Sequence, residues 1–287
     1  MLYLVLSVLC TSLIFVIFKL FDVFKIQTLY AIVANYVVAC TVGLLLSESS
    51  FSFDEVIAKS WFMGAIALGI FFIFVFNLMA KTAQVAGVSV ASVATKMSLV
   101  IPVVFGVILY QEKLSGLQIL GIFLALAAVY FASMKEGGMA ISKKTLILPL
   151  LVFLGSGVID TSIKYFEAVH LEPEEVSIFS AMLFGFAAIS GFCFIGVKAV
   201  KKPIKVNFKN VLGGIFLGVP NYFSIFFLLK ALQHGKLDSA AIFTLNNVAI
   251  VMLTTLLGIL LFKEKMSPKN WGGIALAVVS IVLVALF

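Results

Sequence analysis

Long, almost unbroken apolar runs dominate this sequence and set the strongest limit on its fold. Each run has about 20 residues, the length that an α-helix needs to cross the hydrocarbon core of a bilayer. Hydrophobic residues make up 63% of the 287 residues and charged residues only 11%, too few to cover the surface of a soluble protein of this size. We therefore expect an all-α integral membrane protein. The runs lie at 2–20, 28–46, 61–80, 88–110, 116–134, 146–166, 176–197, 211–229, 240–262 and 270–287.

The connections between the runs are short and polar. The two longest, Ser47–Ser60 and Val197–Asn210, leave no room for a soluble domain. The formal net charge is +7, and every basic residue is a lysine. Because these lysines lie mostly between apolar runs, we expect them to report membrane orientation rather than to contact nucleic acid.

The motifs of common catalytic and cofactor sites are missing from the sequence. It has no GxxxxGK[ST] phosphate loop, no GxSxG and no HExxH, so we expect no cofactor, no metal ion and no enzymatic activity. The cysteines, Cys10, Cys40 and Cys193, lie inside apolar runs without CxxC spacing. We interpret them as small buried hydrophobic residues.

The two halves of the sequence match each other. The stretch 106–125 matches 258–277 at an offset of 152, and 19–22 matches 164–167 at an offset of 145. Four further positions recur at an offset of 149: Gly64, Gly69, Lys81 and Gln84 correspond to Gly213, Gly218, Lys230 and Gln233. We therefore predict two related five-helix units, residues 1–135 and 143–287.

An odd number of helices in each unit fixes their relation in the membrane. The second unit enters upside down, so we predict ten helices in two inverted repeats related by a pseudo-two-fold axis in the membrane plane. Inverted repeats of this kind recur in secondary transporters, with the substrate site near the midplane between the halves.

A pattern near the end of each half resembles a known family. The first copy, Pro102–x3–Gly106–x5–Glu112, resembles the end of an EamA domain, as does the second, Gly258–x5–Glu264. Two tandem EamA domains are typical of the drug/metabolite transporter superfamily. The second copy has a threonine where the first has its proline, so the resemblance does not extend to a kink in both halves.

The resemblance implies a ten-helix basket whose central cavity opens to one side at a time. It implies a multi-pass protein of the bacterial inner membrane, monomeric or homodimeric. Such a protein moves a small solute, for example an amino acid or a sugar, by alternating access, with export as one direction and protons as one coupling partner. Two alternatives stay open. A flippase for a lipid-linked substrate would need an apolar lateral opening, and an intramembrane enzyme would need a midspan cluster of His, Asp or Ser.

Two charged residues lie inside the predicted spans. Lys96 lies about two turns into the fourth run and Asp160 lies deep in the sixth. Charges within a span are costly and usually face a cavity or a partner. Both are therefore candidate substrate-binding residues, with a structural ion pair or a snorkelling lysine as the alternative.

Uncharged polar residues complete the predicted binding site. Interhelical hydrogen bonding is their usual role, but six of them are candidates for lining a cavity: Asn35, Tyr36, Asn221, Tyr222, Asn246 and Asn247.

The family pattern also has a structural interpretation. We expect Pro102 to kink the fourth helix, and Ser115 with Gln118 to form a capping box. Glu112 and Glu264 lie just before helix starts, where a carboxylate satisfies exposed amides; gating is the alternative. Lysines at span ends are expected to be interfacial anchors: Lys19, Lys81, Lys164 and Lys230.

Lysine counts predict the orientation. The connections after odd-numbered helices carry fourteen lysines and those after even-numbered helices carry five. Positive connections stay in the cytoplasm, so both termini are predicted to face outward. The family resemblance implies the opposite orientation.

Overall fold

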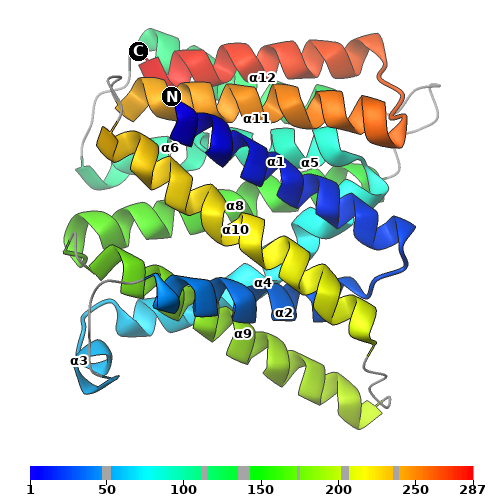
Figure 1. Cartoon of the computed structure of the whole chain (residues 1–287). Coiled ribbons are helices and arrows are strands. Elements are labelled where there is room, and N and C mark those ends of the chain that lie inside the picture. Colours follow the sequence, from blue (N-terminus) through cyan, green and yellow to red (C-terminus); the bar gives the residue numbers. More distant parts are fainter. Residues whose placement is uncertain are drawn as a thin grey trace. The chain divides into compact units, whose positions relative to one another are not determined.

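The computed structural model describes residues 1–46, 53–110, 115–134, 143–172, 175–201, 207–234 and 239–286. These residues are mostly helical, and no strand occurs among them (Figure 1). The helices are α1 (Leu2–Val23), α2 (Thr28–Leu45), α3 (Phe53–Ile57), α4 (Phe62–Val85), α5 (Val88–Met97), α6 (Val100–Tyr110), α7 (Gly116–Ala132), α8 (Lys143–Val169), α9 (Val176–Lys201), α10 (Phe208–His234), α11 (Ser239–Phe262) and α12 (Pro268–Leu286).

Most of these helices have the length and composition of membrane spans. Within the described chain, eight helical stretches are long and apolar enough to cross a bilayer, and the apolar stretches Gly116–Ala132 of α7 and Pro268–Val284 of α12 are slightly shorter. The prediction of an all-helical membrane protein is confirmed. Helix α3 was not predicted, because five residues in a polar connection are too few to give a periodic signal.

The fourth predicted run is interrupted rather than continuous. Helix α5 ends at Met97 and α6 begins at Val100. Pro102 explains the interruption, because it has no amide hydrogen for the carbonyl of Ser98 and its ring clashes with that carbonyl. The Ser98 carbonyl instead accepts a hydrogen bond of 2.9 Å from the amide of Ile101. The predicted kink is present, one turn before the proline.

The chain divides into two compact units, each with segments from both halves of the sequence. Unit 1 comprises Met1–Leu20, Leu78–Thr161 and Phe223–Phe287, and unit 2 comprises Phe21–Asn77 and Ser162–Tyr222. Helices α1, α4, α8 and α10 contribute residues to both units.

In unit 1, helices α7 and α12 pack closely through glycine. A Cβ at Gly121 of α7 would lie 2.7 Å from Cγ2 of Val284, and a Cβ at Gly273 of α12 would overlap the backbone nitrogen of Ala132. At the repeat offset of 152, Gly121 corresponds to Gly273 and Ala132 to Val284, so these contacts are reciprocal. Small residues allow such close approach between helices in lipid.

These two helices also begin with related caps. Ser115 and Gln118 form the predicted capping box at α7. At α12, Pro268 occupies the first helical position as expected, and Ser267 exchanges the equivalent hydrogen bonds with Asn270. The Asn270 amide also donates to carbonyls at the end of α7, so this cap joins the two helices.

Helix α11 completes the packing of unit 1. It lies beside α12 (Figure 1) and also contacts α5. The hydroxyl of Thr254 donates a 2.6 Å hydrogen bond to Oγ of Ser92 on α5. A buried hydroxyl in lipid needs such a partner within the protein.

Unit 2 contains its own pair of reciprocal contacts. A Cβ at Gly64 of α4 would overlap the ring of Phe166, and a Cβ at Gly213 of α10 would lie 3.2 Å from Cε1 of Phe21. The sequence repeat relates Gly64 to Gly213 and Phe21 to Phe166. Gly64 of the first half therefore contacts Phe166 of the second half, and their counterparts in the repeat, Gly213 and Phe21, contact each other in the same way.

Two neighbouring glycines of α12 test the role of close approach. Gly273→Ala is expected to lower the free energy of unfolding by about 1–3 kcal/mol, since the new methyl meets backbone rather than a mobile side chain. Gly272→Ala has open space around it and should be neutral or stabilise by up to about 1 kcal/mol through helix propensity. Thermal unfolding in detergent measures both, and equal midpoints would contradict this packing.

Candidate functional site

Asp160 lies on the side of α8 that points away from its exposed apolar stripe. Ile147, Leu151, Leu154 and Val158 form that stripe. At 3.6 residues per turn, the Asp160 side chain projects about 150° away from it. Asp160 is nevertheless exposed. The side chain is therefore exposed at the surface of the protein on the side of the helix opposite its apolar stripe.

The carboxylate meets the interrupted helix. Ser98, in the turn between α5 and α6, donates a hydrogen bond of 3.0 Å from its hydroxyl to Oδ2 of Asp160. Gly157 makes this approach possible, because a Cβ there would overlap the side chain of Ile101 on α6. A helix interruption and an exposed acid thus lie together, an arrangement found where broken helices line solute sites.

Lys96 is on the same segment, two residues before Ser98. It is half-buried in the last turn of α5. Among the described residues, it forms no ion pair within 4.0 Å, but its charge and that of Asp160 attract each other across unit 1. Because the Lys96 ammonium and the Asp160 carboxylate are not in direct contact, each is available to bind a polar solute.

Several polar atoms inside unit 1 have no protein partner. The hydroxyls of Ser12 and Ser156 and the side-chain oxygen of Asn246 are buried without a hydrogen bond in the described chain. Ser156 lies one turn before Asp160 on α8. Asn247, next to Asn246 on α11, is half-buried. An unpaired buried polar group is costly, so these atoms mark places where water or a solute would be favourable.

The remaining predicted site residues belong to unit 2 and hold helices together. The amide of Asn221 on α10 donates a 3.1 Å hydrogen bond to the side-chain oxygen of Asn35 on α2. Tyr36 is fully buried, and its hydroxyl donates to the carbonyl of Phe72 at 3.0 Å. Tyr222 is half-buried and lies against Gly43 of α2.

Glu264 caps a helix from the other half of the chain. Its carboxylate accepts hydrogen bonds from the amide of Val88 at 2.7 Å and the hydroxyl of Ser89 at 2.9 Å. Gly87, with φ of 114°, and Gly258 both lie against this carboxylate. The exposed amides that Glu264 satisfies are those of α5, whereas α12 has its own cap. Gly106 lies in α6, and Glu112 lies outside the described residues.

Lys19 has a role that its position at a span end did not indicate. Its ammonium donates a 2.7 Å hydrogen bond to the carbonyl of Gln84, and the Gln84 amide donates to the carbonyl of Phe18. Lys19 therefore satisfies a carbonyl at the end of α4, where helix carbonyls lack partners. Lys81 is exposed, Lys230 lies 5.8 Å from the ring of Phe226, and the side chain of Lys164 is outside the described residues.

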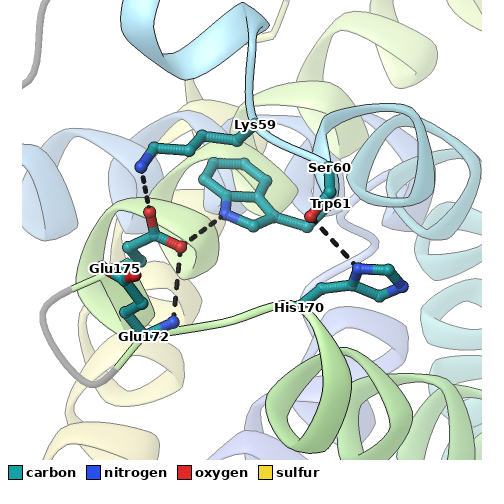
Figure 2. Close-up of polar contacts among 6 residues, drawn as sticks. All are labelled: Lys59, Ser60, Trp61, His170, Glu172 and Glu175. Carbon is teal, nitrogen blue, oxygen red and sulfur yellow. Dashed lines mark hydrogen bonds and ion pairs between the residues drawn. The ribbon is translucent and has the colours of Figure 1, made fainter.

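One polar cluster in unit 2 was missed from the sequence (Figure 2). The carboxylate of Glu175, just before α9, forms an ion pair with Lys59 and accepts a 3.0 Å hydrogen bond from the indole of Trp61. The backbone amide of Glu172 also donates to it. Burial alone raises the pKa of Glu175, but these hydrogen bonds outweigh burial and hold the pKa below its usual value. The hydrogen bond between Lys59 and the Glu175 carboxylate in turn raises the pKa of Lys59.

Residues 1–134 and 143–286 each match the model of the EamA-like transporter family. The chain belongs to the EamA-like transporter family. Membership and the apolar helices together make it a multi-pass membrane transporter rather than an enzyme. The described residues contain no group of three His, Cys, Asp or Glu side chains placed to hold a metal ion.

Two comparisons extend this result. An uncharacterized protein of Haemophilus influenzae is 30% identical over 277 residues, which cover 94% of this chain and 93% of that protein. A protein known from its crystal structure matches with a TM-score of 0.63 and 16% identity, over 99% of this chain and 96% of that chain. At this identity the second match supports the fold alone.

Thiol chemistry tests the exposure of Asp160 in this EamA-like protein. With the three native cysteines changed to Ala, Asp160→Cys is expected to react with a water-soluble thiosulfonate in membranes at least about tenfold faster than Val158→Cys. The thiolate is the reactive form, and a thiol against lipid stays protonated. Equal rates at the two positions would mean that the two faces of α8 do not differ in access to water.

Proposed function

We propose that this protein is a secondary transporter that moves a small metabolite across the bacterial inner membrane by alternating access. The observation that carries the proposal is the exposed side chain of Asp160 beside an interrupted helix. Charges in a span cost about 2.5–3.5 kcal/mol even on insertion scales. A helix break and an exposed acid at one place are most economically explained by a polar solute passing there.

We further propose that residues 1–135 and 143–287 are inverted repeats. The reciprocal contacts of Gly121 with Val284 and Gly273 with Ala132 support this, as does the packing of α7 on α12 and of α2 on α9. Helices in each of these pairs hold equivalent places in the two halves. Exchange of equivalent contacts is what a two-fold relation between the repeats would produce.

The proposed solute carries both charges, as an amino acid or another zwitterion does. Asp160 would bind its ammonium group and Lys96 its carboxylate, while Asn246 and Asn247 supply hydrogen bonds. Support comes from the separation of Lys96 and Asp160, which attract each other without forming an ion pair, and from the unpaired oxygen of Asn246. Asp160 is also the residue that would exchange protons if transport is proton-coupled.

Substitution tests the site directly. Asp160→Asn and Lys96→Met should each reduce uptake of the transported solute by at least about tenfold, because each removes a charge-assisted contact worth roughly 1.5–3 kcal/mol. Asp22→Asn and Lys209→Met make the same changes at exposed positions and should leave uptake unchanged. Uptake is measured in proteoliposomes.

Two results would contradict the proposed site. If Asp160→Asn and Lys96→Met both transport normally, the solute binds elsewhere. If each variant misfolds and the double variant folds, the two residues form a structural pair.

The lysine count supports cytoplasmic connections after the odd-numbered helices, and we propose that both termini face outward. A reporter that is active only in the cytoplasm, fused after Phe287, should therefore be inactive in cells. The same reporter in the Val197–Asn210 connection serves as the control and should be active. Activity of the terminal fusion would reverse the orientation.

A further inference from the structure

Two pairs of residues in unit 2 occupy equivalent places in the repeat. Gln27 and Glu175 immediately precede α2 and α9, and Trp61 corresponds to Asn210 at the offset of 149. Glu175 binds Trp61 and Gln27 binds Asn210. The start of each helix is therefore tied to the segment that follows the end of the other.

This arrangement places the two ties at opposite ends of α2. Gln27 lies at the start of the helix and Trp61 beyond its end, and the 18 residues of α2 span roughly 27 Å at 1.5 Å per residue. Helices α2 and α9 pack against each other, and each begins next to the segment that follows the end of the other. The two helices therefore run antiparallel. Each end of unit 2 therefore has one tie.

The tie at the Glu175 end is charged, and its carboxylate is buried although the Lys59 side chain is 33% exposed. Glu175 is 3% exposed and Trp61 is fully buried. The carboxylate has three donors: the ammonium of Lys59, the indole of Trp61 and the amide of Glu172 (Figure 2). Charge-assisted hydrogen bonds are about twice as strong as neutral ones. Breaking this tie would leave a buried carboxylate to find new partners.

The tie at the Gln27 end is neutral. The backbone amide of Gln27 donates to the side-chain oxygen of Asn210 at 2.9 Å, and the side-chain amide of Asn210 donates to the side-chain oxygen of Gln27 at 3.2 Å. Gln27 is exposed and Asn210 is 3% exposed, but neither side chain carries a charge that loss of this tie would leave buried. Neutral hydrogen bonds of this kind contribute only about 0.5–1.5 kcal/mol.

We infer that Glu175, Lys59 and Trp61 form a latch that keeps their end of unit 2 closed, so that unit 2 without solute opens preferentially at the Gln27–Asn210 end. This inference rests on the alternating access in the proposed function. It makes Glu175 a positioning residue of the transport cycle, because it acts on the segments of unit 2 that it joins and not on the solute.

Ionisation supports the latch over the physiological range. The pKa of Glu175 is below its usual value and that of Lys59 is raised, so both stay charged near neutral pH. The carboxylate contribution is complete above the ordinary glutamate pKa and is lost as pH falls through the lowered value; that of Lys59 is lost only as pH rises above the ordinary lysine value. The other charged or titratable groups nearby are Glu55, Glu172 and His170.

Spin-label distances in nanodiscs test the latch without any solute. In a protein with the native cysteines changed to Ala, one label pair at Ala58 and Val169 reports the latch end, and a second pair at Phe24 and Lys209 reports the other. All four positions are exposed. Glu175→Gln should increase the long-distance population of the first pair roughly three- to tenfold and leave that of the second pair unchanged or smaller.

Matched variants keep the test sharp. Lys59→Met should act in the same direction, and it serves alone if Glu175→Gln does not fold. Glu172→Gln changes an exposed neighbouring acid and should change nothing. Lowering the pH should open the first pair in the unsubstituted protein, only below the usual glutamate pKa, and should have no effect on that pair in Glu175→Gln.

Three results would overturn the latch: unchanged distances in both Glu175→Gln and Lys59→Met, opening at the Phe24–Lys209 pair instead, or an acid response centred near the usual histidine value of about 6.5. The proposed solute site fails separately, through the uptake of the Asp160 and Lys96 variants. If Glu175→Gln opens the latch end while those variants transport normally, the site is wrong and the latch stands.

Discussion

Backbone amides and carbonyls inside a bilayer must find partners within the protein, and this requirement underlies the rest of the structure. Continuous helices meet it wherever the chain faces lipid. The helix is not continuous between α5 and α6, where Pro102 lacks an amide hydrogen and the chain forms a turn at Ser98. Irregular backbone at membrane depth is tolerated only where protein or water covers it. The carboxylate of Asp160 accepts its hydrogen bond from Ser98 at this same place.

Contacts between the halves of the chain follow from the same solvent. Lipid provides little hydrophobic drive for helices to associate, so close packing and interhelical hydrogen bonds hold them. Gly121 and Gly273 supply the close packing in unit 1, and Glu264 supplies a hydrogen-bonded cap from one half to a helix of the other. Because the two halves exchange equivalent contacts, the same residue pattern packs the helices of both halves. The contacts differ locally, as in the charged and neutral ties in unit 2.

Local signals in the sequence were enough for the helices, whereas long-range partners were not. The capping box at Ser115 and the interruption caused by Pro102 were predictable because they depend on residues within one turn. Asp160 could be singled out from the cost of a charge in a span, but its hydrogen-bond partner Ser98 could not be identified from sequence. Glu175 was missed because its side-chain partners, Lys59 and Trp61, lie more than a hundred residues away, in a polar connection that carries no periodic pattern. For the same reason, the α5 amides that Glu264 caps could not be identified from sequence.

Solute counterflow in proteoliposomes tests the central claim most directly. Vesicles preloaded with an excess of an unlabelled amino acid mixture should take up labelled amino acid transiently, with saturation and at least about tenfold above protein-free vesicles, and sugar mixtures should neither drive nor inhibit this uptake. That result is predicted by a site with one accessible acid and one half-buried base. Counterflow of sugars without counterflow of any zwitterion would contradict the proposed chemistry of the Asp160–Lys96 site, and no counterflow with either mixture would contradict its role in solute transport.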